Sequence, residues 1–287
     1  MIQAILQYEF LQNAFLTGLL IGVIAPLIGA FIVVRRLSLI ADALSHVTLS
    51  GIAVSLFLSK TFTGLAGLNP LFIGMAFSVA GSLFIERLRD LYKHYQELAI
   101  PIILSGGIGI GAIFISLADG FNTDLFSYLF GSVSAVSRAD LYVIILVSIL
   151  VISLIIILYK ELFLLSFDEE YAKASGISAK MIHFIFMVMV ALVIAASMRV
   201  VGILLVSSLM TLPVAASIRI SRGFKQTIGF SVLFGELSVI IGLISAYYLD
   251  LAPGGTIVVS AIIILLLSIV YKKVSTNFDV KRNEVRI

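Results

Sequence analysis

The sequence predicts an all-α membrane protein, a polytopic bundle of about eight or nine transmembrane helices that forms one domain over residues 1–287. Of the 287 residues, 61% are hydrophobic and 12% are charged, whereas soluble domains are about 45–50% apolar and about 25% charged. The mean hydropathy is +1.17. The apolar residues form continuous runs near the 20 residues or so that a bilayer-crossing helix needs. A transmembrane β-barrel would instead alternate apolar and polar residues.

Nine apolar runs are predicted to be spans. They cover residues 11–34, 40–59, 67–85, 100–118, 140–159, 182–197, 200–217, 227–248 and 253–271. Only Ser197-Met198-Arg199 divides the pair at 182–217, so eight spans are the alternative if this pair forms one element. A weaker apolar stretch at 125–136 contains Gly131 and several serines, and it predicts a short helix outside the membrane or dipping into it.

The distribution of Lys and Arg predicts the orientation, because these residues are in excess in cytoplasmic loops. With nine spans, 16 of the 19 basic residues lie on one side, and Lys60, Arg138 and Arg199 lie on the other. This distribution places the loop at about 161–180 and the polar tail at 272–287 in the cytoplasm. The N-terminus is then outside, or inside if there are eight spans.

Other features exclude several classes of protein. The chain has no cysteine, so disulfides and thiolate metal sites are excluded. Its net charge of +3 is explained by loop sorting, and we expect no binding of nucleic acid. The P-loop pattern G-x-x-x-x-G-K-[ST] is absent, as are H-E-x-x-H and G-x-S-x-G. We therefore expect a non-enzymatic protein that cannot itself hydrolyse ATP at a P-loop.

Asp42 and His46 are the leading candidate metal ligands. They are four residues apart, so on a helix they share one face. A carboxylate oxygen and an imidazole nitrogen suit zinc or manganese, and charged residues within spans usually face a cavity or a pathway. A polar pair that orders the start of a helix after Arg35-Arg36 is the alternative. Two ligands suit a weak transit site, so no permanently bound cofactor is expected.

Glu236, a carboxylate inside an apolar span, is a second candidate for the metal path. It could equally pair with a serine or with the backbone of a neighbouring helix. Close packing of helices is predicted where glycines are four residues apart, at Gly18 and Gly22 and at Gly107 and Gly111.

A short helix is predicted at Asp168 to Ala174, in the long loop between two spans. Acidic residues at its start suit the helix dipole, and Gly176 suits the C-terminal cap. Such a helix could dock a partner protein, although a plain connector would show the same spacing. The candidate partner-binding residues are Phe167, Asp168, Glu169, Ala172 and Gly176.

Four ordered motifs, which together extend over most of the chain, resemble the ABC-type zinc/manganese permeases, the ZnuB-like membrane subunits. They are residues 34–46, residues 167–176, the pair 198–202 and 209–216, and residues 252–258. By this resemblance, Asp42 and His46 fall where the family's metal-path pair lies, and residues 167–176 fall where its ATPase docks. Glu236 belongs to no motif that can be carried over. The Gly254-Gly255 pair is more similar to zinc members than to manganese members.

The resemblance implies a homodimer of the type II ABC importer architecture, with the metal pathway between the two copies. Cytoplasmic ATP-binding subunits and an extracellular metal-binding lipoprotein would complete the transporter in the plasma (inner) membrane of a prokaryote. The expected function is that of the permease of an ATP-driven zinc importer, with a manganese or iron importer of the same family as the alternative. A proton-coupled secondary metal transporter is the alternative of another class, and it would need inverted repeats and proton carriers near the midplane.

Overall fold

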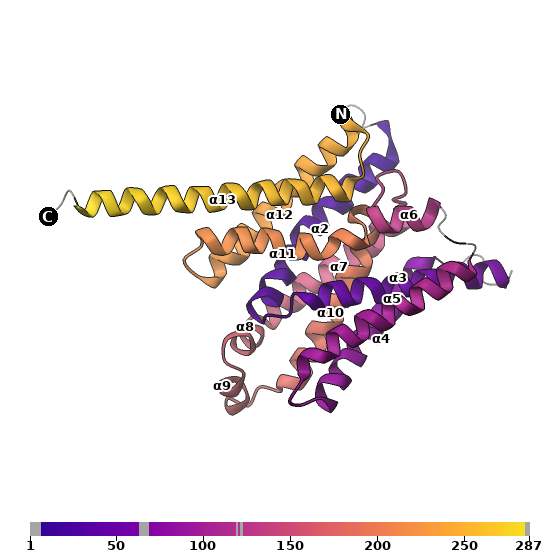
Figure 1. Ribbon diagram of the computed structural model, residues 1–287, viewed down its shortest axis with the longest axis horizontal. Coiled ribbons are helices and arrows are strands. Elements are labelled where there is room, and N and C mark those ends of the chain that lie inside the picture. The colour runs from indigo at the N-terminus through magenta and orange to yellow at the C-terminus, as the bar shows by residue number, and fades with distance from the viewer. Residues whose placement is uncertain (1–6, 63–68, 119, 121–122, 285–287) are drawn as a thin grey trace.

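The computed structural model describes residues 7–62, 69–118, 120 and 123–284, and in these ranges the chain forms helices and connecting turns without any strand (Figure 1). The elements are α2 (Glu9–Val34), α3 (Leu39–Thr61), α4 (Pro70–Leu91), the 3₁₀ helix η2 (Gln96–Leu98), α5 (Ala99–Leu117), α6 (Thr123–Phe130), α7 (Arg138–Ile157), α8 (Tyr159–Phe167), α9 (Glu169–Ala174), α10 (Ala179–Val201), α11 (Ile203–Ile220), α12 (Phe224–Leu249) and α13 (Pro253–Glu284). The all-α membrane fold is therefore confirmed. The start of the run predicted at 67–85 lies outside the described residues.

In the part of the chain that the structure describes, eight helices are long and apolar enough to cross a membrane, and α11 contains a shorter apolar helix, Leu205–Ile220. The break in the pair at 182–217 is at Gly202, between α10 and α11. The predicted divider, Ser197-Met198-Arg199, lies inside α10 instead. Gly202 has φ +84°, a region that only glycine enters at little cost. α10 therefore ends because of the backbone conformation of Gly202, and the polar residues that were predicted to end it lie within the helix.

The helices run back and forth between two ends of the bundle. At one end, Arg138 at the start of α7 forms an ion pair with Glu9 at the start of α2. We call this the Gly202 end, because the α10–α11 turn also lies there. At the opposite end, which we call the α9 end, Lys180 of α10 lies 3.6 Å from Asp90 of α4. Within the described residues this alternation gives nine passes, with α2 starting at the Gly202 end and α13 leading away from it.

Two groups of helices flank three central helices. In Figure 1, α3, α4 and α5 form one group and α11, α12 and α13 form the other, with α2, α7 and α10 between them. α2 and α10 are among the most buried spans, and Phe31 of α2 and Phe186 of α10 are fully buried against each other. The tail predicted at 272–287 continues α13 as a helix to Glu284, and it projects from the bundle (Figure 1).

The predicted close packing at the paired glycines is confirmed. A Cβ at Gly18 would meet Leu243 of α12 at 2.8 Å, and one at Gly22 would meet the Glu236 carboxylate at 3.0 Å. At Gly107 of α5 it would lie 3.0 Å from the Val47 backbone of α3. These glycines let neighbouring helices pack against the backbone of the glycine-bearing helix.

Three further glycines join distant segments at the Gly202 end. Gly131 follows α6, Gly202 ends α10, and Gly254 opens α13. A Cβ on any of them would strike backbone atoms of the other segments. Ser132 N–H also donates to the Arg199 carbonyl at 2.9 Å. α6, the α10–α11 turn and the start of α13 are therefore held together by main-chain contacts, which leave no room for a side chain.

We predict that Gly202→Ala destabilises the protein. The new Cβ would lie about 2.5 Å from the Gly131 nitrogen, and a strained positive-φ residue alone costs about 1–3 kcal/mol. Gly229→Ala in α12 is the matched control, because nothing lies within 4 Å of its added Cβ and Gly→Ala inside a helix stabilises by about 0.5–1 kcal/mol. Thermal unfolding in detergent should give Gly202→Ala a lower melting temperature than the wild type. An unchanged melting temperature would contradict this packing.

Candidate functional site

Asp42 and His46 lie on the first turns of α3, one helical turn apart. Both side chains are half-buried, whereas the intervening Ala43, Leu44 and Ser45 are buried. Ser45 donates its hydroxyl to the Ala41 carbonyl one turn back at 2.7 Å, so its hydrogen-bonding capacity is used within the helix. The carboxylate and the imidazole are thus the groups that this part of α3 offers to a ligand.

A cavity of about 440 Å³ opens beside His46, between α3 and α5. Its lining is otherwise mostly apolar and small, and it comprises Leu49, Gly107, Ile108, Gly111, Ala112, Ile115, Ser116 and Gly120. Ser50 bridges the two helices by donating to the Gly107 carbonyl. His46 is the one imidazole or carboxylate among the lining residues, and it is therefore the group in this cavity best suited to bind a metal ion.

Glu236 does not join Asp42 and His46. Its carboxylate lies against Gly22, where α12 packs on α2, whereas His46 faces α5. No group of three or more His, Cys, Asp or Glu side chains that could hold a metal occurs among the residues that the structure describes. One copy of the chain therefore offers a pair of ligands, and Glu236 is placed as a group of the α2–α12 contact.

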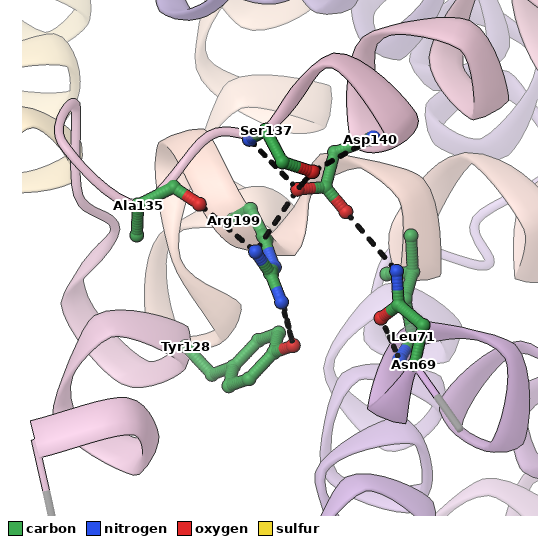
Figure 2. Close-up of polar contacts among 7 residues, drawn as sticks. All are labelled: Asn69, Leu71, Tyr128, Ala135, Ser137, Asp140 and Arg199. Atoms are coloured by element: carbon green, nitrogen blue, oxygen red, sulfur yellow. Dashed lines mark hydrogen bonds and ion pairs between the residues drawn. The ribbon is translucent and has the colours of Figure 1, made fainter. Parts of the chain in front are cut away.

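A second polar cluster lies at the Gly202 end (Figure 2). Arg199 of α10 donates to the Asp140 carboxylate of α7 and to the Ala135 carbonyl, both at 2.9 Å, and also to the Tyr128 hydroxyl of α6. Asp140 also accepts from Ser137 N–H at 2.9 Å, in a capping box that begins α7. The paired charges fasten α6, α7 and α10 together, which is a structural role.

The sequence does not predict this cluster, because in the sequence Arg199 is only one of three basic residues on the sparsely charged side and part of a motif. The spacing Ser137-x-x-Asp140 could have predicted the capping box, since Ser with an acidic residue three positions later is a helix-start signal. The partner of a buried Asp140 carboxylate could not be predicted, because Arg199 is 59 residues further along the chain.

The predicted docking loop forms two helices, α8 and α9. Asp168 caps α9 by accepting the Tyr171 N–H at 2.8 Å. At the other end Gly176 has φ +83°, and the Ile177 N–H reaches back to the Ala172 carbonyl at 3.1 Å. This pattern is a Schellman cap, which favours glycine at the left-handed position. The short helix predicted at Asp168 to Ala174 is confirmed, with Asp168 as its cap.

The residues proposed to contact a partner differ in exposure. Phe167 is 58% exposed, and Asp168, Glu169 and Gly176 are also exposed. Ala172 is fully buried, because it is the residue of α9 that faces the rest of the chain. Ala172 therefore packs the loop against the rest of the chain. Of the predicted set, only the other four residues could contact a partner.

Aromatic rings attach this loop to the bundle. The ring of Phe167 lies tilted against that of Phe163 of α8, with centroids 4.8 Å apart. Its centroid also lies 5.5 Å from that of Phe224 at the start of α12, edge to face. Phe224 in turn lies 5.1 Å from Phe31 of α2, edge to face. Edge-to-face pairs of this kind stabilise packing beyond the area they bury. α8 therefore contacts α12 through these rings, and Phe224 of α12 in turn contacts α2.

A family model, described as "ABC 3 transport family", matches residues 7–272. The chain belongs to the ABC 3 transport family. It is a multi-pass permease of a metal ABC transporter in the plasma membrane, and it is not an enzyme, because ATP hydrolysis resides on a separate subunit. The resemblance given by the four sequence motifs is confirmed. Membership also favours the ATP-driven importer over the proton-coupled alternative.

Curated relatives and a solved structure match almost the whole permease. The "Manganese transport system membrane protein MntC" of Listeria monocytogenes is 34% identical over 285 residues, 99% of this chain and 98% of that protein. The "Manganese import system permease protein ScaB" of Streptococcus gordonii is 35% identical over 268 residues, 93% of each chain. The structure of "PsaBC from Streptococcus pneumoniae in complex with Fab" has a TM-score of 0.81 at 32% identity, with 93% of each chain covered.

Proposed function

We propose that this permease carries manganese into the cell through a site that two copies of the chain build together. The observation that carries the proposal is the incomplete ligand pair. Asp42 and His46 are both half-buried, His46 lines an open cavity, and one copy offers no third residue to join them among those described. A second copy would supply a second pair, giving two carboxylates and two imidazoles around one ion.

The outer face of α5 is suited to receive that second copy. Ser105, Gly109, Ala112 and Ser116 are exposed along one side of the helix, and nothing in this chain lies within 4 Å of an added Cβ at Gly109. Small residues at three- and four-residue spacing let transmembrane helices approach closely. Ala112 and Ser116 also line the cavity beside His46, so a chain docked here would close that cavity.

Manganese is the preferred ion over zinc. The relatives named above carry manganese in their names, and the donor set lacks the thiolates that favour zinc, while carboxylates suit manganese. The Gly254-Gly255 pair is the sequence feature that favoured zinc. A Cβ at Gly254 would strike the Val201 carbonyl, so helix packing explains that glycine without reference to the ion.

The remaining parts of the transporter would bind at the two ends. α9 presents an exposed, capped helix to a cytoplasmic ATP-binding subunit, and the aromatic contacts of Phe167 would pass its motion to α2 and α12. The Gly202 end would receive the extracellular metal-binding lipoprotein. Basic residues are in excess in cytoplasmic loops, and the sequence puts 16 of its 19 on one side of the spans; this excess supports a cytoplasmic α9 end and a cytoplasmic C-terminus.

We predict that Asp42→Asn and His46→Ala each lower manganese uptake by about 100-fold or more, since losing even an outer-shell partner of a metal costs about 10–100-fold. Uptake of radioactive manganese into liposomes that hold the complete transporter would measure it. His94→Ala is the matched control, because His94 is exposed in the connection between α4 and α5. Wild-type uptake by His46→Ala would show that the path runs elsewhere.

We predict that a cysteine at Thr61 is labelled from outside intact cells and that one at Lys93 is not. Both positions are exposed, and they lie at opposite ends of the bundle. The chain has no native cysteine, so each label reports one position. A membrane-impermeant maleimide gives the readout, and the reverse pattern would invert the orientation.

We predict that Gly176→Pro releases the ATP-binding subunit. Proline fixes φ near −65°, whereas Gly176 has φ +83°, so the cap of α9 would be lost. Gly176→Asn is the matched control, because asparagine tolerates the left-handed region. The amount of ATP-binding subunit that copurifies with the permease measures the effect. Equal recovery with both variants would argue against docking at α9.

A further inference from the structure

Arg35 carries a buried donor without an acceptor. It follows the last residue of α2 at the α9 end, and its Nη1 atom is buried and makes no hydrogen bond. The guanidinium lies over the ring of Phe186, 5.3 Å from the centroid. Buried charged donors are nearly always paired, so an unpaired one at this position suggests a state of the protein in which an acceptor arrives.

Two glutamates act on Arg35 electrostatically. Burial lowers the pKa of Arg35, the charge of Arg89 lowers it further, and Glu169 and Glu86 oppose the shift. Glu86 is already engaged, because its carboxylate lies 2.6 Å from His183 and 3.3 Å from Arg89. Both contacts are made by its Oε1 atom, so this carboxylate already neutralises other cationic groups.

Glu169 is the acceptor that can change partners. It forms an ion pair with Lys173 at 2.7 Å, and both side chains are more than half exposed. The hydrogen bond from Lys173 lowers the pKa of Glu169, and the charge of Arg35 lowers it further. Exposed pairs of this kind contribute little to stability. If Glu169 exchanged Lys173 for Arg35, the protein would therefore lose little stability.

The turn that holds Arg35 leads directly into the metal-binding helix. Arg36 N–H donates to the Val33 carbonyl at 3.0 Å and Leu37 N–H donates to the Ile32 carbonyl at 2.9 Å, with Arg36 at φ +57°. These bonds make a tight Schellman turn, and α3 begins at Leu39. A pull on Arg35 would therefore be transmitted through a short, hydrogen-bonded segment to α3.

We propose that Glu169 leaves Lys173 and pairs with Arg35 when the ATP-binding subunits close against α9. The new ion pair would draw the α2–α3 turn toward α9 and reorient α3, which carries Asp42 and His46. Arg35 and Glu169 are then positioning residues that couple ATP hydrolysis to movement of the ion. The proposal rests on the proposed docking of the ATP-binding subunit at α9.

The test compares Glu169→Gln with its neighbour Glu170→Gln in the complete transporter in liposomes. The readout is manganese transported per ATP hydrolysed. Glu169→Gln should lower this ratio by about tenfold, within the roughly 5–150-fold range typical of coupling between two sites, and Glu170→Gln should leave it near the wild-type value.

A charge exchange separates coupling from a merely structural role. Arg35→Glu alone should lower the ratio, and Arg35→Glu combined with Glu169→Arg should restore part of it. Equal ratios for Glu169→Gln and Glu170→Gln would overturn the proposal, even if the Arg35 variants fail to fold. If the subunit still copurifies with Gly176→Pro, docking at α9 itself is wrong. Retained docking at α9 with an unchanged ratio in Glu169→Gln overturns only the role of this ion pair.

Discussion

The hydrocarbon core of a bilayer offers no water, so each polar group buried in this protein needs a partner within the chain. Most follow this constraint in the simplest way. Ser45, Thr48 and Ser197 donate to carbonyls one turn back in their own helices, and the buried Asp140 is paired with Arg199. Among the described residues, six buried side-chain atoms lack a hydrogen-bond partner, and the Arg35 Nη1 atom is one of them. The half-buried Asp42–His46 pair and Arg35 are the groups around which transport can be explained.

The two ends of the bundle are built differently, and this difference suggests where motion begins. At the Gly202 end, glycines bring main chains into contact and a charged network fastens α6, α7 and α10. These segments have little room to move relative to one another, because their backbone atoms are already in contact. At the α9 end, the Phe167–Phe224 ring contact joins α8 to α12, and the exposed ion pair of Lys180 with Asp90 links α10 to α4. Contacts of this kind rearrange at small cost, so a partner's motion can enter here.

The sequence predicted the helices well because hydropathy and length decide what can cross a membrane. It also predicted α9, since an acidic start and Gly176 are local signals. The break at Gly202 was misplaced, because a valine–glycine sequence within an apolar run has no polarity signal and only the positive φ reveals it. The Arg199–Asp140 pair and the burial of Ala172 depend on contacts between distant segments. The preference for zinc drew on the Gly254-Gly255 pair, and the small size of Gly254 serves packing.

The claim that two copies share one ion can be tested by counting the imidazoles on it. Pulsed electron paramagnetic resonance of Mn²⁺ bound to the purified permease detects the nitrogen nuclei of coordinating histidines. Differently tagged chains would give mixed dimers of wild type and His46→Ala. We predict nitrogen signals from two imidazoles in the wild-type dimer, from one in the mixed dimer, and from none when both copies carry His46→Ala. The same nitrogen signal in all three samples would contradict a site made by His46 of each copy.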